Sequence, residues 1–202
     1  MGAPTICLIL VSVKQKETKD EMNNQSPWSF TTQRVVLAAL FAALVVVLKL
    51  TGIGVIPVPN LSGGATIYHV PVILGGIIGG PIVGMVAGLV MGILLLIDFA
   101  AFGPIVMLPG RILIGLMAWL VYRALRKGGA GAWLAGLVAG AVGALTNTVV
   151  TVLLATTLKS DLFPAVAVPT VLPQAGAELV IGAIICAIVA QAVESALKAR
   201  NA

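Results

Sequence analysis

The chain has 202 residues, of which 59% are hydrophobic and only 9% are charged, with a formal net charge of +5 and a mean hydropathy of +1.12. So few charged residues leave too little polar surface to cover a soluble globule, which excludes that class of protein. The apolar stretches are long and lack the strict two-residue alternation of barrel strands, and about 20 helical residues cross a hydrocarbon core of about 30 Å. The composition therefore predicts an all-α integral membrane protein.

Residues 1–30 are predicted to form a mobile cytoplasmic leader. Its apolar run, Ile6–Val13, is too short to span a membrane, and the basic residues follow this run rather than precede it, unlike in a signal peptide. Translation from Met22 instead of Met1 is an open alternative. Residues 31–202 are predicted to form one membrane domain.

Hydrophobic runs separated by glycine, proline and charged residues predict a bundle of six transmembrane helices, at about 32–51, 67–80, 82–99, 106–125, 130–157 and 173–196. Six spans place both termini on the same side. With the termini inside, most of the Lys and Arg residues are cytoplasmic, as the positive-inside rule requires. These residues are Lys14, Lys16, Lys19, Arg34, Arg123, Arg126, Lys127, Lys198 and Arg200. The net charge thus follows from topology and does not indicate nucleic-acid binding.

Small residues recur every four positions in three of these segments, a spacing that lets neighbouring helices approach closely. The third segment has Gly80, Gly84, Gly88 and Gly92, and the fifth has Ala132, Gly136 and Gly140. Both are predicted to be packing stripes. The first segment has two such pairs, Ala38 with Ala42 and Ala39 with Ala43. By pattern alone these alanines favour packing within the chain over docking to a partner.

Strongly polar residues at membrane depth are costly, and here they gather near the outer end of the predicted bundle. They are Tyr68, His69, Asp98, Arg111, Asn147, Gln174 and Glu178. Gln174 and Glu178 are four residues apart and share one helix face. Because these residues come from separate segments and reach a common depth, they predict a polar, ligand-binding cavity.

Each of these residues also has a purely structural interpretation. Arg111 and Glu178 are as well suited to neutralising one another as to binding a ligand. Asn147 could simply form a hydrogen bond to a neighbouring helix. Asp98 could simply be a solvated residue at the end of a helix. His69, the only histidine, has no companion at metal-ligand spacing, so no metal site is predicted. No cofactor is predicted either.

Catalytic motifs and a phosphate-binding loop are missing from the sequence. The chain is therefore not expected to be an enzyme, and any uphill transport must take its energy from another protein.

Taken together, several segments resemble a known family. They are "TTQRVVLAALFAALVVVLKL", "ATIYHVPVILGGIIGGPIVGMVAGLVMGIL", "LPGRILIGLMAWLVYRAL" and "GALTNTVV". Over about residues 32–196 the chain resembles the substrate-binding S component of an energy-coupling factor (ECF) vitamin transporter, an ABC importer.

The resemblance implies a six-helix bundle in the cytoplasmic membrane of a bacterium or archaeon, with both termini cytoplasmic. It further implies capture of a vitamin or related micronutrient from outside, in a pocket formed by helices four to six and the first outer loop. The implied partners are a transmembrane coupling protein and two cytoplasmic ATPase subunits, with which the S component topples to release its cargo inward. The family's A-x-x-x-A docking motif corresponds to Ala38 and Ala42, or to Ala39 and Ala43, which reverses the preference from pattern alone.

Two features of the sequence indicate the class of substrate. A buried guanidinium at Arg111 suits a carboxylate, which makes pantothenate the first candidate. Aromatic residues are few, which favours a small, flexible or weakly aromatic substrate over a large flat ring, although four of them, Tyr68, Phe99, Phe102 and Phe163, lie near the outer side.

Two other functions compete with substrate capture. A stand-alone channel or secondary transporter would have polar groups through its full depth, whereas the inner half here is nearly bare. A purely structural scaffold would have no use for convergent polar groups.

Overall fold

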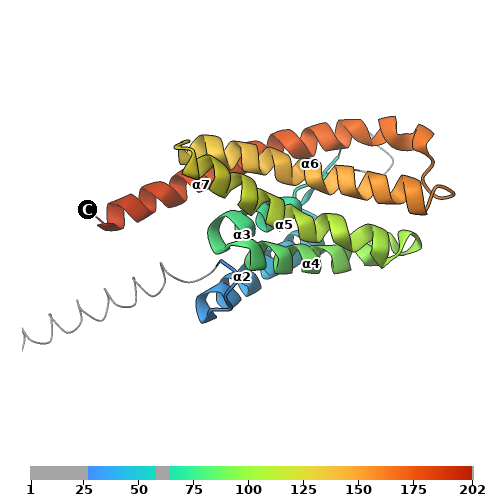
Figure 1. The fold of residues 1–202 in the computed structure, drawn as a ribbon. Coiled ribbons are helices and arrows are strands. Elements are labelled where there is room, and N and C mark those ends of the chain that lie inside the picture. The colour runs from blue at the N-terminus through green and yellow to red at the C-terminus, as the bar shows by residue number, and fades with distance from the viewer. Residues whose placement is uncertain (1–26, 58–63, 202) are drawn as a thin grey trace, which may run out of the picture.

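The computed structural model describes residues 27–57 and 64–201. Most of the predicted leader, including Met22, lies outside these residues. The described part of the chain forms six α-helices (Figure 1): α2 (Thr32–Thr51), α3 (His69–Gly79), α4 (Pro81–Asp98), α5 (Pro104–Lys127), α6 (Ala132–Leu158) and α7 (Leu172–Asn201). The predicted all-α membrane bundle is confirmed.

Five of the six helices are long and apolar enough to cross a membrane, and α3, with 11 residues, is shorter. The predicted division between α3 and α4 at Gly79-Gly80-Pro81 is correct. Gly80 has a φ of 93°, which a residue with a side chain rarely adopts, and Pro81 occupies the first turn of α4. The two residue types therefore force a sharp turn between two apolar helices.

The glycine stripe of α4 lies against α5, as its spacing predicts. A Cβ added at Gly84 would meet the Cα of Gly115 at 2.7 Å and that of Gly76 at 2.8 Å, so the backbones of α3, α4 and α5 are in contact there. Gly88 faces the backbone of Arg111 in the same manner. Gly80 belongs to the turn and not to this interface.

The stripe of α6 packs against α7. A Cβ at Gly136 would come within 2.7 Å of both the Ala190 side chain and the Cys186 carbonyl oxygen, and one at Gly140 would meet the Gly182 carbonyl oxygen at 2.7 Å. Small residues thus fix the spacing between the two longest helices.

The connections at one end of the bundle are structured, and we call this end the loop end. It consists of a two-stranded antiparallel hairpin, β1 (Val55–Ile56) with β2 (Ala65–Thr66), and two 3-10 helices, η1 (Ala100–Phe102) and η2 (Ala165–Val171). The chain enters α2 and leaves α7 at the opposite end (Figure 1). The hairpin was not predicted from the sequence, because its strands have only two residues each.

Much of the apolar surface faces outward. In α2, Phe41 and Val45 are buried, whereas Val36, Leu40 and Val47 are exposed. Exposed aliphatic side chains along a helix suit a lipid or a membrane partner as the surrounding medium. At the end opposite the loop end, Trp28, from the final residues of the predicted leader, packs edge-on against Trp119 with their ring centroids 6.1 Å apart.

Candidate functional site

A cavity of about 450 Å³ lies at the loop end, a size typical of small-molecule sites. Its wall combines the ends of α2 and α4, the hairpin, the first turns of α5, the second half of α6 and the start of α7. The cavity reaches the protein surface, because the lining residues Val55 and Leu162 are exposed. Five of the six predicted substrate-binding residues line it: Tyr68, Arg111, Asn147, Gln174 and Glu178.

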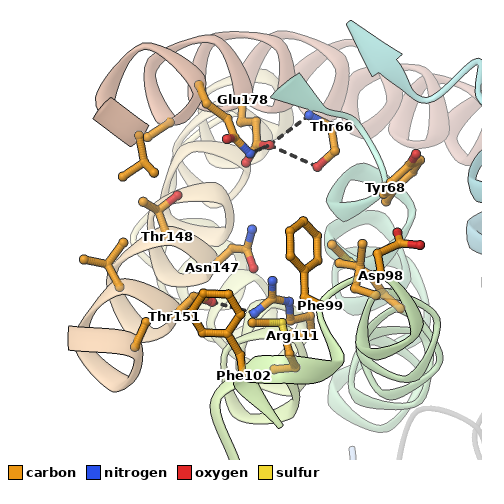
Figure 2. A pocket seen from close by; sticks show the side chains of 18 of the residues that line it. Thr66, Tyr68, Asp98, Phe99, Phe102, Arg111, Asn147, Thr148, Thr151 and Glu178 are labelled. Atoms are coloured by element: carbon orange, nitrogen blue, oxygen red, sulfur yellow. Dashed lines mark hydrogen bonds between the residues drawn. The ribbon is translucent and has the colours of Figure 1, made fainter. Parts of the chain in front are cut away.

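Arg111 is 7% exposed and extends from α5 into this cavity (Figure 2). Its Nη1 donates a hydrogen bond of 2.6 Å to Thr151 Oγ1 on α6. Its Nε has no acceptor among the described residues. A buried guanidinium with one hydroxyl partner retains most of its donors for a ligand.

Glu178, on α7, is 2% exposed and is held by other partners. Its Oε1 accepts hydrogen bonds from the Thr66 backbone N–H (2.8 Å), the Thr66 hydroxyl (3.0 Å) and Gln174 Nε2 (2.9 Å). The ion pairs of the described residues do not include one between Glu178 and Arg111. Of the two interpretations left open by the sequence, the structural ion pair is therefore excluded for the described conformation.

Asn147 is 8% exposed and shares a face of α6 with Thr151, one turn later. Its Oδ1 accepts no hydrogen bond from the described residues, so the suggested bond to a neighbouring helix is not formed through this atom. In the view of Figure 2, the side chain lies between Glu178 and Arg111.

The prediction that His69 contacts substrate finds no support in the geometry. His69 is fully buried and is not part of the cavity wall. Its Nε2 donates to the backbone carbonyl of Glu178 at 3.2 Å, and Gly182 leaves room for the ring. His69 thus supports α7 from behind the site. Among the described residues, no cluster of His, Cys, Asp and Glu could hold a metal ion.

The cavity wall has more aromatic character than the composition indicated. Tyr68, Phe99, Phe102 and Phe163 all line it, together with apolar residues such as Met91 and Leu95. The few aromatic residues of the outer half are concentrated at the site. Scarcity of aromatic residues is therefore no longer an argument against a ring-containing substrate.

Lys49 and Asp98 also line the cavity and form an ion pair that joins the ends of α2 and α4. Asp98, whose side chain is 41% exposed, had been expected to be a solvated helix end. It is partly solvated, but it has a cationic partner. Both residues lie at helix ends on the outer side of the predicted topology, and the sequence could have predicted the ion pair from this shared position.

Sequence reasoning missed Thr66 and Thr151. Thr151 was detectable, because a residue four positions after Asn147 faces the same way on a helix. Thr66 was not, since its role depends on the hairpin that brings its N–H and hydroxyl to Glu178. Thr148, the residue after Asn147, lines the cavity as well.

An apolar helical bundle with a solute-sized cavity at one end, lined by apolar side chains and a few buried polar groups, is the architecture of a membrane-embedded solute-binding protein. The family model of the ECF transporter substrate-specific component matches residues 33–195, and the chain belongs to this family. No curated protein matches the chain. The family resemblance expected from the sequence is confirmed, and so is the class of protein: a transporter's substrate-binding component.

Proposed function

We propose that this protein captures a vitamin or a related micronutrient from outside the cell, in the cavity at the loop end, and delivers it inward when coupled to an ATP-driven module. A transmembrane coupling protein and two cytoplasmic ATPase subunits form this module. In this proposal the six-helix bundle, with the 11-residue α3 as its short member, crosses the cytoplasmic membrane six times and keeps both termini in the cytoplasm. The positive-inside bias of its Lys and Arg residues supports this orientation.

The observation that carries the proposal is the state of Arg111. Its charge is buried in the cavity, and the ion pairs of the described residues do not include it. A charge at membrane depth without a directly bonded counter-ion is costly, which favours a ligand that supplies the opposite charge. A carboxylate is the natural partner, because its two oxygens accept from a guanidinium in parallel. Pantothenate, which has one carboxylate, remains the first candidate.

We propose that the coupling protein docks on the face of α2 that is exposed on the surface of the bundle. Ala39 and Ala43 are exposed there, whereas Ala38 is buried and Ala42 is half-buried. Two exposed small residues four positions apart let a partner helix approach closely. This burial pattern favours the pair Ala39 and Ala43 over the pair Ala38 and Ala42.

Native mass spectrometry of gently purified protein tests the function, followed by calorimetry with any small molecule found and with pantothenate. We expect one bound molecule per chain. The substitution Arg111→Gln should raise Kd by about 10- to 100-fold, which corresponds to the loss of a charge-assisted hydrogen bond. The matched control is Thr157→Val, an exposed position on the same α6 helix that carries Thr151.

A protein that is empty after purification and binds none of the water-soluble vitamins would overturn the proposal. Flux of a solute through the isolated protein in liposomes would instead indicate a channel or secondary transporter.

A further inference from the structure

The cavity carries hydrogen-bonding groups of opposite character at two separate places. Arg111 provides only donors, and Glu178, as a carboxylate, provides only acceptors. The two side chains form no ion pair, and Figure 2 shows them on different sides of the cavity, with Thr66 beside one and Thr151 beside the other.

The two carboxylate oxygens of Glu178 have different surroundings. Oε1 already accepts three hydrogen bonds, two from Thr66 and one from Gln174, which exhausts its capacity. Oε2 receives no hydrogen bond from the described residues, and Glu178 lines the cavity. The structural task of Glu178, which is to hold the hairpin against α7, therefore uses one oxygen and leaves the other for a ligand.

Asn147 lies between these two groups in the view of Figure 2. Its side chain is more than nine-tenths buried, yet its Oδ1 has no partner among the described residues. Leaving a buried amide oxygen without a partner costs more free energy than an ordinary hydrogen bond contributes, so a ligand that donates to it is favoured. An amide offers an acceptor and two donors, which match another amide or a comparable polar group.

The charges of the cavity do not favour a simple anion. Lys49 and Asp98 neutralise each other at the rim, which leaves one cationic and one anionic group, Arg111 and Glu178, facing the interior. A ligand with negative charge at both ends would be repelled by Glu178. A ligand whose polarity changes along its length is complementary to both.

We infer that the substrate is bipolar, with an anionic group that binds Arg111, hydroxyl or amine donors that bind Glu178 Oε2, and an amide-like group between them at Asn147. This inference rests on the proposed function, because it assigns the substrate class of the same cavity. Glu178 is then a specificity-determining residue, which separates this substrate from carboxylates that have an apolar end. The apolar and aromatic wall contacts the rest of the molecule.

The test uses the full-length protein and removes the interaction between Glu178 and the ligand donors in two ways, once by changing the protein and once by changing the ligand. Glu178→Gln keeps an oxygen for Thr66 and replaces the oxygen that faces the ligand with a donor. On the ligand side, pantothenate is compared with N-(3,3-dimethylbutanoyl)-β-alanine, which has the same carboxylate and amide but lacks both hydroxyls. If native mass spectrometry identifies another ligand, its analogue without the terminal donors replaces this pair.

We expect Glu178→Gln to raise Kd by about 10-fold for the complete ligand and to leave Kd for the donor-free analogue nearly unchanged. Arg111→Gln should weaken both ligands. Thermal unfolding of each variant checks the fold, and the ligand pair measured on the wild-type protein keeps the test decisive if Glu178→Gln does not fold.

The outcomes separate this inference from the function on which it rests. A wild-type protein that binds the complete ligand and its donor-free analogue equally well would overturn the inference while leaving substrate capture intact. The same holds if the bound compound has no hydroxyl or amine. A wild-type protein that binds no small molecule at all would overturn the proposed function and the inference with it.

Discussion

The contact between α4 and α5 makes Gly88 the sharpest test of how packing positions the site. A Cβ added there would overlap the carbonyl oxygen of Arg111 and would lie 2.8 Å from its carbonyl carbon and 3.2 Å from the Cα of Ile112. These are backbone atoms, so no side-chain rotation relieves the overlap. Gly88→Ala must therefore push α5 away from α4 at the residue that carries the guanidinium.

The magnitude follows from two opposing effects. Overpacking a close interface costs about 1–3 kcal/mol, whereas replacing glycine with alanine inside a helix stabilises it by about 0.5–1 kcal/mol. We expect the free energy of unfolding to fall by up to about 2.5 kcal/mol, the largest difference between these effects. Kd for the bound ligand should rise by about 10-fold, because displacement of Arg111 lengthens its charge-assisted hydrogen bonds.

Both quantities are measurable on purified protein, by denaturant unfolding in detergent and by calorimetry. Gly176→Ala is the matched control, since Gly176 lies in α7 beside the cavity residue Ala175, and a Cβ there meets nothing within 4 Å. The control should retain its Kd and be as stable as the wild type or slightly more so. If Gly88→Ala is as stable as this control and binds equally well, the backbone contact does not position Arg111.

Two further perturbations address other parts of the molecule. Replacing Ala39 and Ala43 together with leucine should spare ligand binding by the isolated protein and impair assembly and uptake, since both side chains lie on the exposed face of α2; normal uptake in cells would contradict the docking assignment. Lys49→Met, compared with Asp98→Asn and the double variant, should give a coupling energy of about 1 kcal/mol or less, because both side chains are partly solvated. A coupling energy well above that value in denaturant unfolding would show that the pair is shielded from water.

The helices were predictable because their ends are marked by residue chemistry. The predicted range 32–51 agrees with α2, which ends before Gly52 in the left-handed conformation. Gly80 and Pro81 mark the boundary between α3 and α4 equally clearly. In a chain that is apolar throughout, these glycine and proline signals still mark the helix ends, although amphipathic periodicity is absent.

The residues that line the cavity could be predicted more reliably than the contacts that they make with one another. Arg111, Asn147 and Glu178 were expected together because a polar residue at membrane depth has few stable locations. The helix face on which each residue lies is harder to predict. Lipid is as apolar as the protein interior, so the lipid-facing and buried sides of a helix have similar sequences. For that reason His69 was placed at the site although it lies behind it. The partner of Glu178 depended on the hairpin at Thr66, a contact between residues 112 positions apart.

The meeting of three backbones at Gly76, Gly84 and Gly115 also has a kinetic consequence. With no side chains between them, α3, α4 and α5 cannot separate at this point through rotamer changes. The 3-10 helices η1 and η2 contain no buried residues, so they are the elements that open at low cost. A solute reaches the cavity from the loop end, where the lining residues Val55 and Leu162 are exposed. We therefore expect substitutions in the loop end to change mainly the association rate of a ligand, and substitutions of the polar groups in the cavity wall to change mainly its residence time.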